Sequence, residues 1–522
     1  MINELDTNIV DDFDDKTPKL KAKRYNTKYK LYREFAIATL SALSETKTTE
    51  NATSQPQISA LDALACTGLA GIQWKKHISK DVHVTLADHD DITKLTANAE
   101  ANSLSCSILK LNPLRTPGDL HGLQGEKEIH ICQADAKAVM TMEAFNFIFL
   151  NPQKNSTTYF EPAFNSITCR GIVCFIFPDI SLFARSPHVV QRYYSANIIK
   201  TEYLKELAGR IIIANLAKAA ARCNKGISVQ YIVSHEDNLL ICVKVSRGHS
   251  HADSSLTQIA QLLHCRFCEQ RIFIEPQLSV LEDPYSLLGC KCKEKHVGKT
   301  AVTLGPMWKG SIFDWEFLNL VQKHGKQLKL SSKFLEVTHQ LFAECMCSDK
   351  VNTNGVVRGG NKSATAQATD TVSNNGDAPS LDSSKDQKEQ SEIKQQKDTA
   401  EIVNEKDVVV GSAEAQSDQS TGISCIVTDP APNIHKRKMD DGDEKQEESK
   451  RQCKDQSVMM KPQSENVPFY YNINKFKRTN IPKLDKLVTI LHCSGHKASR
   501  THFDHSSIRT SASVEEFLSI IG

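Results

Sequence analysis

The chain has 522 residues and is nearly neutral, with 64 Lys and Arg against 62 Asp and Glu, a formal net charge of +2. This balance excludes a histone-like basic protein and a strongly acidic solvating chain. The 16 cysteines are too dilute for a small disulfide scaffold. The acidic N-terminal stretch lacks the pattern of a signal peptide, and no run reaches the roughly 20 apolar residues that span a bilayer. We therefore expect an intracellular protein with reduced thiols and no membrane partner.

Two segments are predicted to be disordered. Residues 1–24 are polar and charge-segregated, and residues 348–465 contain no Phe, Trp or Tyr. Such compositions bury too little apolar surface to offset the entropy of the chain. Residues 348–465 hold 16 Lys and Arg against 22 Asp and Glu, whereas the chain outside both segments holds 43 against 34. The part predicted to fold is therefore cationic, as a protein that binds a phosphate backbone should be.

Strand and helix patterns alternate between these segments. Helical patterns cover residues 93–102 and 201–222. Strand-like runs occur at residues 60–65, 82–87, 128–132, 145–150 and 171–177, followed by the closely spaced pair 228–233 and 239–245. A parallel series of strands and helices that ends in an antiparallel hairpin is the layout of a doubly wound α/β domain.

Small and acidic residues follow the first three of these strands. Thr67-Gly68 follows the first, and a glycine there lets the backbone approach a ligand. The second strand ends in Asp88 and the third in Asp135-Ala136, where an acid can accept hydrogen bonds from ribose hydroxyls or from an adenine amino group. The glycine and each of the Asp residues are also ordinary turn formers. Together they favour an adenosyl cofactor.

The fourth strand ends in Asn151-Pro152-Gln153-Lys154. An Asn at this place can accept an N–H from an exocyclic amine and align the amine lone pair on an incoming methyl group, while the proline stiffens the loop. An Asn-Pro dipeptide is equally an ordinary turn signal. We predict Asn151 and Pro152 as catalytic residues.

A CxxC and a CxC pair predict a structural zinc site, because two short knuckles supply four soft ligands with little strain. The predicted ligands are Cys265, Cys268, Cys290 and Cys292. Unligated thiols are the alternative, and Cys345 with Cys347 is a rival pair.

Basic and aromatic side chains alternate near the C-terminus, a pattern that suits phosphate contact with base stacking. Arg500, His502 and Arg509 are the predicted RNA-binding residues, and a solvated surface with one buried Phe503 is the alternative. Lys436-Arg437-Lys438 and Lys450-Arg451 resemble a bipartite nuclear signal. We therefore expect a nuclear rather than a cytoplasmic protein.

Several motifs match the signature of one known family. They are Tyr25-Asn26 with Arg33-Glu34, Thr67 to Trp74 (TGLAGIQW), Pro178-Asp179-Ile180, Gly305 to Gly310 (GPMWKG) and Ala498 to Phe503 (ASRTHF). On these residues the chain resembles the tRNA (guanine(26)-N(2))-dimethyltransferase family, and within it the animal "tRNA methyltransferase 1-like" branch. The resemblance covers residues 25–347 and 466–522.

The resemblance implies a class I (Rossmann-like) S-adenosylmethionine methyltransferase domain at residues 25–249. An α+β C-terminal domain with zinc knuckles, formed by residues 250–347 and 466–522 around the insertion, would bind tRNA. The implied reaction is methylation of the exocyclic N2 of a tRNA guanine. The implied cofactor contacts are Arg33, Thr67, Gly68, Asp88, Asp135 and Ala136, and the implied zinc ligands are the four cysteines above.

The chain departs from the family on the side of the target base. Asn151 takes the place of the catalytic Asp of a DPFG motif, and Gln153 and Lys154 replace its aromatic residue and glycine. Asp237-Asn238 stands where the family has a His-aromatic pair. Three functions stay open: a guanine N2-methyltransferase, a catalytically degenerate tRNA-binding homologue, and an amine methyltransferase acting on adenine or protein.

Overall fold

The computed structural model describes residues 2–10, 25–50, 58–78, 82–90, 92–110, 125–274, 284–296, 300–348, 469–476 and 482–521. Apart from Ser348, the predicted insertion at residues 348–465 lies outside the described residues, and so do residues 11–24 of the predicted disordered N-terminus. No described helix is long and apolar enough to cross a membrane.

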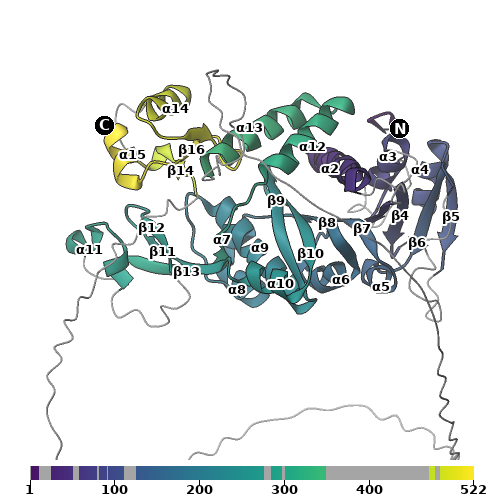
Figure 1. Cartoon of the computed structure of the whole chain (residues 1–522), viewed down its shortest axis with the longest axis horizontal. Coiled ribbons are helices and arrows are strands. Elements are labelled where there is room, and N and C mark those ends of the chain that lie inside the picture. Colours follow the sequence, from purple (N-terminus) through teal and green to yellow (C-terminus); the bar gives the residue numbers. More distant parts are fainter. Residues whose placement is uncertain are drawn as a thin grey trace, which may run out of the picture. The chain divides into compact units, whose positions relative to one another are not determined.

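An eight-stranded mixed sheet forms the centre of the molecule, in the order β5-β6-β4-β3-β7-β8-β10-β9 (Figure 1). Neighbours from β5 to β8 are parallel, whereas β10 lies antiparallel between β8 and β9. The strands are β3 (Ile58–Asp62), β4 (Val82–Asp88), β5 (Ser105–Leu109), β6 (Glu128–Gln133), β7 (Phe145–Leu150), β8 (Ile167–Phe177), β9 (Lys225–His235) and β10 (Asn238–Arg247). The predicted parallel series with a closing hairpin is confirmed.

Helices pack on this sheet. The helices of this part are α2 (Lys30–Glu50), α3 (Leu69–His77), α4 (Thr93–Ala101), α5 (Ala136–Met142), α6 (Phe160–Ser166), α7 (Leu182–Arg185), α8 (Pro187–Tyr194), α9 (Leu204–Arg222) and α10 (His249–Leu256). Gly71 allows α3 to approach β4 closely, since a Cβ atom there would lie 2.2 Å from Leu86 Cδ2. The helix that begins after the first strand is therefore held tightly against the sheet.

Two small antiparallel sheets and five helices follow in the described part of the chain. The first sheet has the order β12-β11-β13, and the second has the order β14-β16-β15. Their strands are β11 (Ile259–Cys265), β12 (Arg271–Ile274), β13 (Ala301–Trp308), β14 (Tyr471–Asn472), β15 (Ala498–Arg500) and β16 (Ser507–Thr510). The main helices are α12 (Trp315–Gln327), α13 (Ser332–Ser348), α14 (Leu484–Cys493) and α15 (Val514–Ile520), and the short α11 spans Cys292–Lys295. This α+β region is the predicted one.

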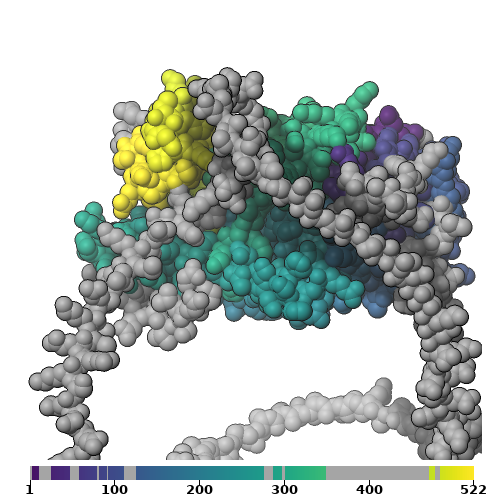
Figure 2. Space-filling view, in the orientation of Figure 1, coloured from purple at the N-terminus to yellow at the C-terminus, as the bar shows by residue number. Residues whose placement is uncertain are grey.

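The core of the central sheet continues into α12 and α13, both of which pack on α2. The rings of Phe35 on α2 and Phe334 on α13 have centroids 4.7 Å apart. A second, smaller core around Tyr471, Leu487 and Phe517 belongs to the C-terminal sheet and helices, which are yellow in Figure 2. Much of the predicted C-terminal domain therefore shares one apolar core with the central sheet.

The N-terminus differs from the prediction of disorder over residues 1–24. The structure describes a hairpin of β1 (Ile2–Glu4) and β2 (Thr7–Ile9). Ile9 is fully buried in the main core, and Glu4 is buried against polar partners. The prediction is wrong for residues 2–10, because a polar composition does not reveal that a distant residue neutralises the buried charge.

Candidate functional site

A cavity of about 320 Å³ opens at the carboxyl ends of β3, β4 and β7, where the strand order reverses. This is the place where ligands bind in doubly wound sheets. Five of the predicted site residues line it, namely Arg33, Thr67, Asp88, Asn151 and Pro152. Predicted cofactor-binding residues and the predicted catalytic residues therefore line the same cavity.

The loop after β3 is fixed by the end of β4. Cys66 N donates to Asp88 Oδ2 at 3.0 Å, and Asp90 N donates to Asp88 Oδ1 at 3.0 Å. Gly68 has φ 77°, a left-handed conformation that glycine adopts without strain, and it precedes α3. Asn98 Nδ2 holds the carbonyl of Thr67 at 2.9 Å. The Asp88 carboxylate thus shapes the loop and also lines the cavity.

Arg33 meets the N-terminal hairpin beside the cavity. Its Nε and Nη2 donate to the two Glu4 oxygens at 2.9 and 2.7 Å. Tyr25 Oη and Gln73 Nε2 also donate to Glu4, at 2.9 and 3.2 Å. Burial raises the pKa of Glu4, but these bonds and the Arg33 charge hold it below its ordinary value. Glu4 is therefore an ionised partner that fixes the Arg33 guanidinium.

Asp62, the last residue of β3, lines the cavity and was not predicted as a site residue. Burial and the neighbouring Asp88 raise the pKa of Asp62 to about 7, against a hydrogen bond from the Gly71 amide. Its position at the end of the first strand, before the glycine-containing loop, is the sequence signal that could have identified it. The site therefore contains a carboxyl group that changes protonation near neutral pH.

The side-chain oxygen of Asn151 is the unsatisfied acceptor of this cavity. Asn151 Oδ1 is buried and has no hydrogen-bond partner among the described residues. The long bond of 3.5 Å from Gln153 Nε2 to Tyr29 Oη lies beside it. Buried acceptors are nearly always paired, so an orphan in a ligand-sized cavity indicates a missing donor.

Four aromatic side chains line the cavity although the motif at Asn151 lacks one, namely Tyr25, Tyr29, Phe149 and Tyr159. Tyr29 lies next to the predicted opening motif, and Tyr159 follows the Asn-Pro loop. Burial, followed by the negative charge of Asp135, raises the pKa of Tyr159, so its hydroxyl stays neutral. Sequence reasoning missed the rings of Tyr29 and Tyr159, because it sought the aromatic residue only within the four-residue motif.

The other predicted cofactor residues lie just outside the cavity lining. Asp135 caps α5 by accepting from Lys137 N at 2.9 Å, and its carboxylate lies 3.2 Å from Lys137 Nζ. Ala136 is buried, and Gly68 immediately precedes α3. A role of Asp135, Ala136 or Gly68 in cofactor binding stays a prediction.

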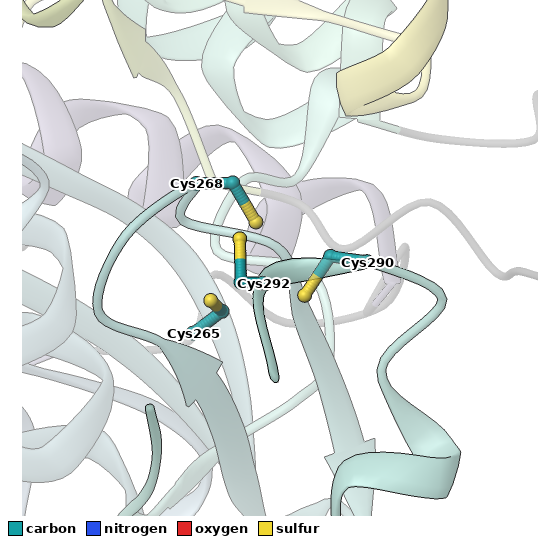
Figure 3. A group of neighbouring side chains, drawn as sticks. All are labelled: Cys265, Cys268, Cys290 and Cys292. Carbon is teal, nitrogen blue, oxygen red and sulfur yellow. The ribbon is translucent and has the colours of Figure 1, made fainter. Parts of the chain in front are cut away.

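The four predicted zinc ligands come together (Figure 3). The four sulfur atoms all lie within 4.8 Å of one another, and they belong to Cys265, Cys268, Cys290 and Cys292. A tetrahedral zinc ion with bonds of about 2.3 Å needs sulfur atoms about 3.8 Å apart. The donor set and its spacing fit zinc.

The rival cysteine pair lies elsewhere. Cys345 is buried in the main core, and Cys347 Sγ lies 3.4 Å from Ser499 Oγ. Neither belongs to the sulfur cluster, so these residues do not replace Cys290 and Cys292 there.

The predicted RNA contact of Arg509 is wrong. Arg509 is 1% exposed and donates to Glu206 Oε2 at 2.8 Å and to Glu344 Oε2 at 3.1 Å. The His502 side chain is 2% exposed, with Nδ1 2.5 Å from Glu344 Oε1, but the residue also lines the second cavity described below. The Arg509 guanidinium is paired inside the protein and does not reach the surface, whereas an RNA contact of His502 stays a prediction. Alternation of basic and aromatic residues did not distinguish a buried ion network from a binding surface.

Arg500 is exposed and pairs with Asp485 through two hydrogen bonds of 2.9 and 2.8 Å. It lines a second cavity, of about 600 Å³, together with residues of β9 and α13. Lys28 lies 3.3 Å from Glu236, which lines this second cavity, while its neighbour Tyr29 lines the first. The two cavities are therefore adjacent.

The turn between β9 and β10 carries the Asp237-Asn238 departure. The Asp237 carbonyl accepts from Ile180 N at 2.9 Å, and its Oδ1 accepts from Ser181 N at 3.0 Å. Tyr32 Oη donates to the Asn238 carbonyl at 3.0 Å. These residues therefore fix the loop after β8 to the turn.

Comparison with known proteins decides the family. A family profile described as N2,N2-dimethylguanosine tRNA methyltransferase matches residues 6–353 and 433–522. The chain belongs to this family. It is 32% identical to the tRNA (guanine(27)-N(2))-dimethyltransferases of Rattus norvegicus and Homo sapiens, over its whole length and over 64% and 63% of theirs. The chain thus spans less than two thirds of these relatives. The predicted family and animal branch are confirmed.

More distant relatives agree with this family. The tRNA (guanine(26)-N(2))-dimethyltransferase of Methanobrevibacter smithii is 24% identical over 62% of this chain and 75% of its own. Among solved structures, Trm1 from Pyrococcus horikoshii with S-adenosyl-L-methionine is similar, with a TM-score of 0.58 and 18% identity. The similarity covers 95% of this chain and 94% of the other. The predicted fold class is confirmed.

Proposed function

We propose that the protein is an S-adenosylmethionine-dependent tRNA methyltransferase that acts on the exocyclic N2 of a guanine. The family and the names of the relatives support this function. The observation that carries it is the unpaired, buried Asn151 Oδ1 in the cavity at the end of β7. A guanine amino group is a donor that would satisfy this oxygen.

The cavity suits an adenosyl cofactor. Arg33, Thr67 and Asp88 line it, and a carboxylate at this place can accept a hydrogen bond from a ribose hydroxyl. When bound, S-adenosylmethionine supplies the methyl group. The chain's own residues bind and orient the two reactants.

The target amine has to be held in line with the methyl group. Guanine N2 is conjugated and weakly nucleophilic, so the base has to leave the stack and enter the site. Asn151 Oδ1 would accept one N2–H bond, and this aligns the nitrogen lone pair and offsets the positive charge that develops on the amine. Tyr29 and Tyr159 offer rings against which the base can stack.

A catalytically degenerate tRNA-binding homologue is the second candidate. The neutral Asn151 in place of an anionic acceptor favours it, as do Gln153 and Lys154 at the rim of the cavity. The same residues leave an adenine or protein amine as a third possible acceptor.

One experiment separates these candidates. The full chain is incubated with radiolabelled S-adenosylmethionine and an unmodified tRNA transcript, and the nucleosides of the product are analysed. We expect label in N2-methylated guanosine. Bound tRNA without label would favour the degenerate homologue, and label in adenosine or in protein would favour the third candidate.

We also propose that Cys265, Cys268, Cys290 and Cys292 hold a structural zinc ion. Arg500, which is exposed beside the second cavity, stays a proposed RNA contact. The nuclear location stays a prediction, and the residues on which it depends lie outside the described part of the chain.

A further inference from the structure

An aromatic side chain is exposed at the tip of the first cysteine knuckle. Phe267, between Cys265 and Cys268, is 48% exposed. Its ring stacks on the imidazole of His296, with centroids 3.9 Å apart and planes 1° apart. One face of Phe267 is thus covered by a parallel ring, and a large fraction of the side chain meets solvent.

The backbone holds this tip in a fixed conformation. Cys265 N donates to the Gln270 carbonyl at 2.8 Å, Glu269 N donates to the Cys265 carbonyl at 3.0 Å, and Arg266 N donates to the Thr300 carbonyl at 2.9 Å. The ring is therefore presented by a closed turn, which reduces the entropy lost when a ligand binds.

Basic side chains surround the stacked pair. We define the knuckle tip as residues 266–267 and 291–296. Its exposed charged residues are Arg266, Lys291, Lys293, Glu294 and Lys295. Four basic groups against one acid, beside an exposed ring, match a nucleobase with its flanking phosphates better than an apolar protein surface.

We propose that the knuckle tip binds an unpaired nucleobase of the substrate RNA, which stacks on Phe267 while its phosphates lie against the tip's basic side chains. This inference rests on the proposed function, because it takes tRNA as the partner. It assigns the knuckle a role in RNA recognition beyond holding a metal ion. A base is favoured because a stack that already contains two parallel rings is extended by a third planar ring.

The test compares two RNA probes by fluorescence anisotropy with the full chain. One is a labelled tRNA transcript, and the other is a blunt-ended RNA duplex that has no unpaired base. We expect Phe267→Leu to weaken tRNA binding roughly 5- to 100-fold, as for loss of one base–aromatic stack. Binding of the duplex should stay within twofold. Trp315→Leu, on α12, is the matched control, because Trp315 is 49% exposed outside the tip.

The charge contribution is tested by salt dependence. Lys291→Gln with Lys295→Gln should reduce the slope of log Kd against log salt concentration by about 1.4 for two lost phosphate contacts. Lys326→Gln with Lys329→Gln, two exposed lysines at the end of α12, should leave the slope unchanged. Zinc content, measured on every variant, verifies that the knuckle is intact.

The outcomes are distinct. The knuckle-tip proposal is overturned if Phe267→Leu keeps its zinc and binds tRNA within twofold of wild type. It is also overturned if the substitution weakens duplex binding as much as tRNA binding. In both cases the proposed guanine methylation stands. If the wild-type chain binds no tRNA, both proposals are overturned. If the wild-type chain transfers no methyl group to guanosine, but Phe267→Leu still weakens the binding of tRNA and not of the duplex, only the proposed activity is overturned.

Discussion

The proposed chemistry depends most on one atom, the side-chain oxygen of Asn151. Its oxygen is aimed at no protein donor in the described part of the chain, although the loop is otherwise well determined by Pro152 and by packing at the end of β7. An amide oxygen accepts an N–H bond but carries no full charge, so it stabilises developing positive charge less than a carboxylate does. The site is therefore suited to orient an amine even with a weaker electrostatic contribution.

Replacement of this oxygen gives the first prediction. Asn151→Ala should lower the rate of methyl transfer to guanosine by about 10²- to 10³-fold, because it removes the acceptor that acts in the transition state. The affinity for S-adenosylmethionine, measured by calorimetry, should change less than twofold. Asn151→Asp is the control of equal size, and it should match or exceed the wild-type rate. Equal rates for wild type and Asn151→Ala would contradict the role of this atom.

Asp62 gives a prediction of pH dependence. Its pKa is raised from 3.8 to about 7 in the folded protein, so the folded state holds a proton that the unfolded state releases. Its contribution to stability is complete below about pH 4 and is lost as the pH rises through about 7, at most about 4 kcal/mol.

Asp62→Asn should therefore flatten the fall in melting temperature between pH 4 and 7 and stabilise the cofactor-free protein above pH 7. The amide oxygen can still accept the Gly71 hydrogen bond. The melting temperature of both proteins is measured across this range by calorimetry. A parallel pH dependence for wild type and variant would show that Asp62 does not titrate there.

At the scale of secondary-structure elements, the N-terminal hairpin connects two features predicted to bind the cofactor, namely Arg33 and the loop after β3. Glu4 of β1 fixes Arg33, and the main chain of residues 8–10 binds α4, where Val10 N donates to Asn98 Oδ1 at 2.9 Å. Asn98 in turn holds the Thr67 carbonyl. The hairpin therefore supports both Arg33 and the loop after β3.

Glu4→Ala should weaken S-adenosylmethionine binding by roughly tenfold and lower the melting temperature, because it leaves the nearly buried Arg33 without its counter-charge. Titration calorimetry measures the affinity. Asn3→Ala, on the same strand, removes only an exposed bond to Asn8 and should have little effect. An unchanged affinity in Glu4→Ala would exclude a positioning role for the hairpin.

The cysteine cluster gives the prediction on metal. Cys268→Ser should release zinc and loosen β11 and β12, because the small core between these strands includes Cys265 and Leu288. Elemental analysis and hydrogen exchange of β11 measure the two effects. Cys347→Ser should retain the metal, since its sulfur lies outside the cluster. Full zinc content in Cys268→Ser would remove the cluster as the site.

The helices and strands show where sequence patterns suffice. The strands from β3 to β10 were predicted with the exception of β5, because runs of Val, Ile and Phe between turn residues are a strong local signal. Helix α2 was missed, because Leu31 to Leu40 are buried on all sides and Arg33, Glu34 and Thr39 interrupt the apolar pattern. The hairpin β1–β2 was missed because its stability comes from contacts with Arg33 and Asn98, distant in sequence.

At the scale of the whole molecule, contacts between residues that are distant in sequence also explain why the predicted RNA contact of Arg509 is wrong. The ASRTHF motif supports the family resemblance, yet the sequence does not show that Glu206 on α9 and Glu344 on α13 converge on a residue of β16. Arg509 therefore contacts two segments that lie 165 and 303 residues before it in the chain. We therefore expect the folding of residues 482–521 to depend on this buried ion network.

Removal of the Arg509 charge should destabilise the region where α9, α13 and β16 meet. Arg509→Met leaves Glu206 and Glu344 buried, with Arg210, Thr501 and His502 among their remaining partners, and we expect a loss of about 3–5 kcal/mol in the free energy of unfolding. Arg500→Met is the matched control, nine residues away, because its pair with Asp485 is solvent-exposed and should contribute about 1 kcal/mol or less. Urea denaturation of both variants measures the difference. Since the carboxylates and not the arginine create the cost, Arg509→Met combined with Glu344→Gln should recover part of the loss, whereas a purely steric role for Arg509 predicts no recovery.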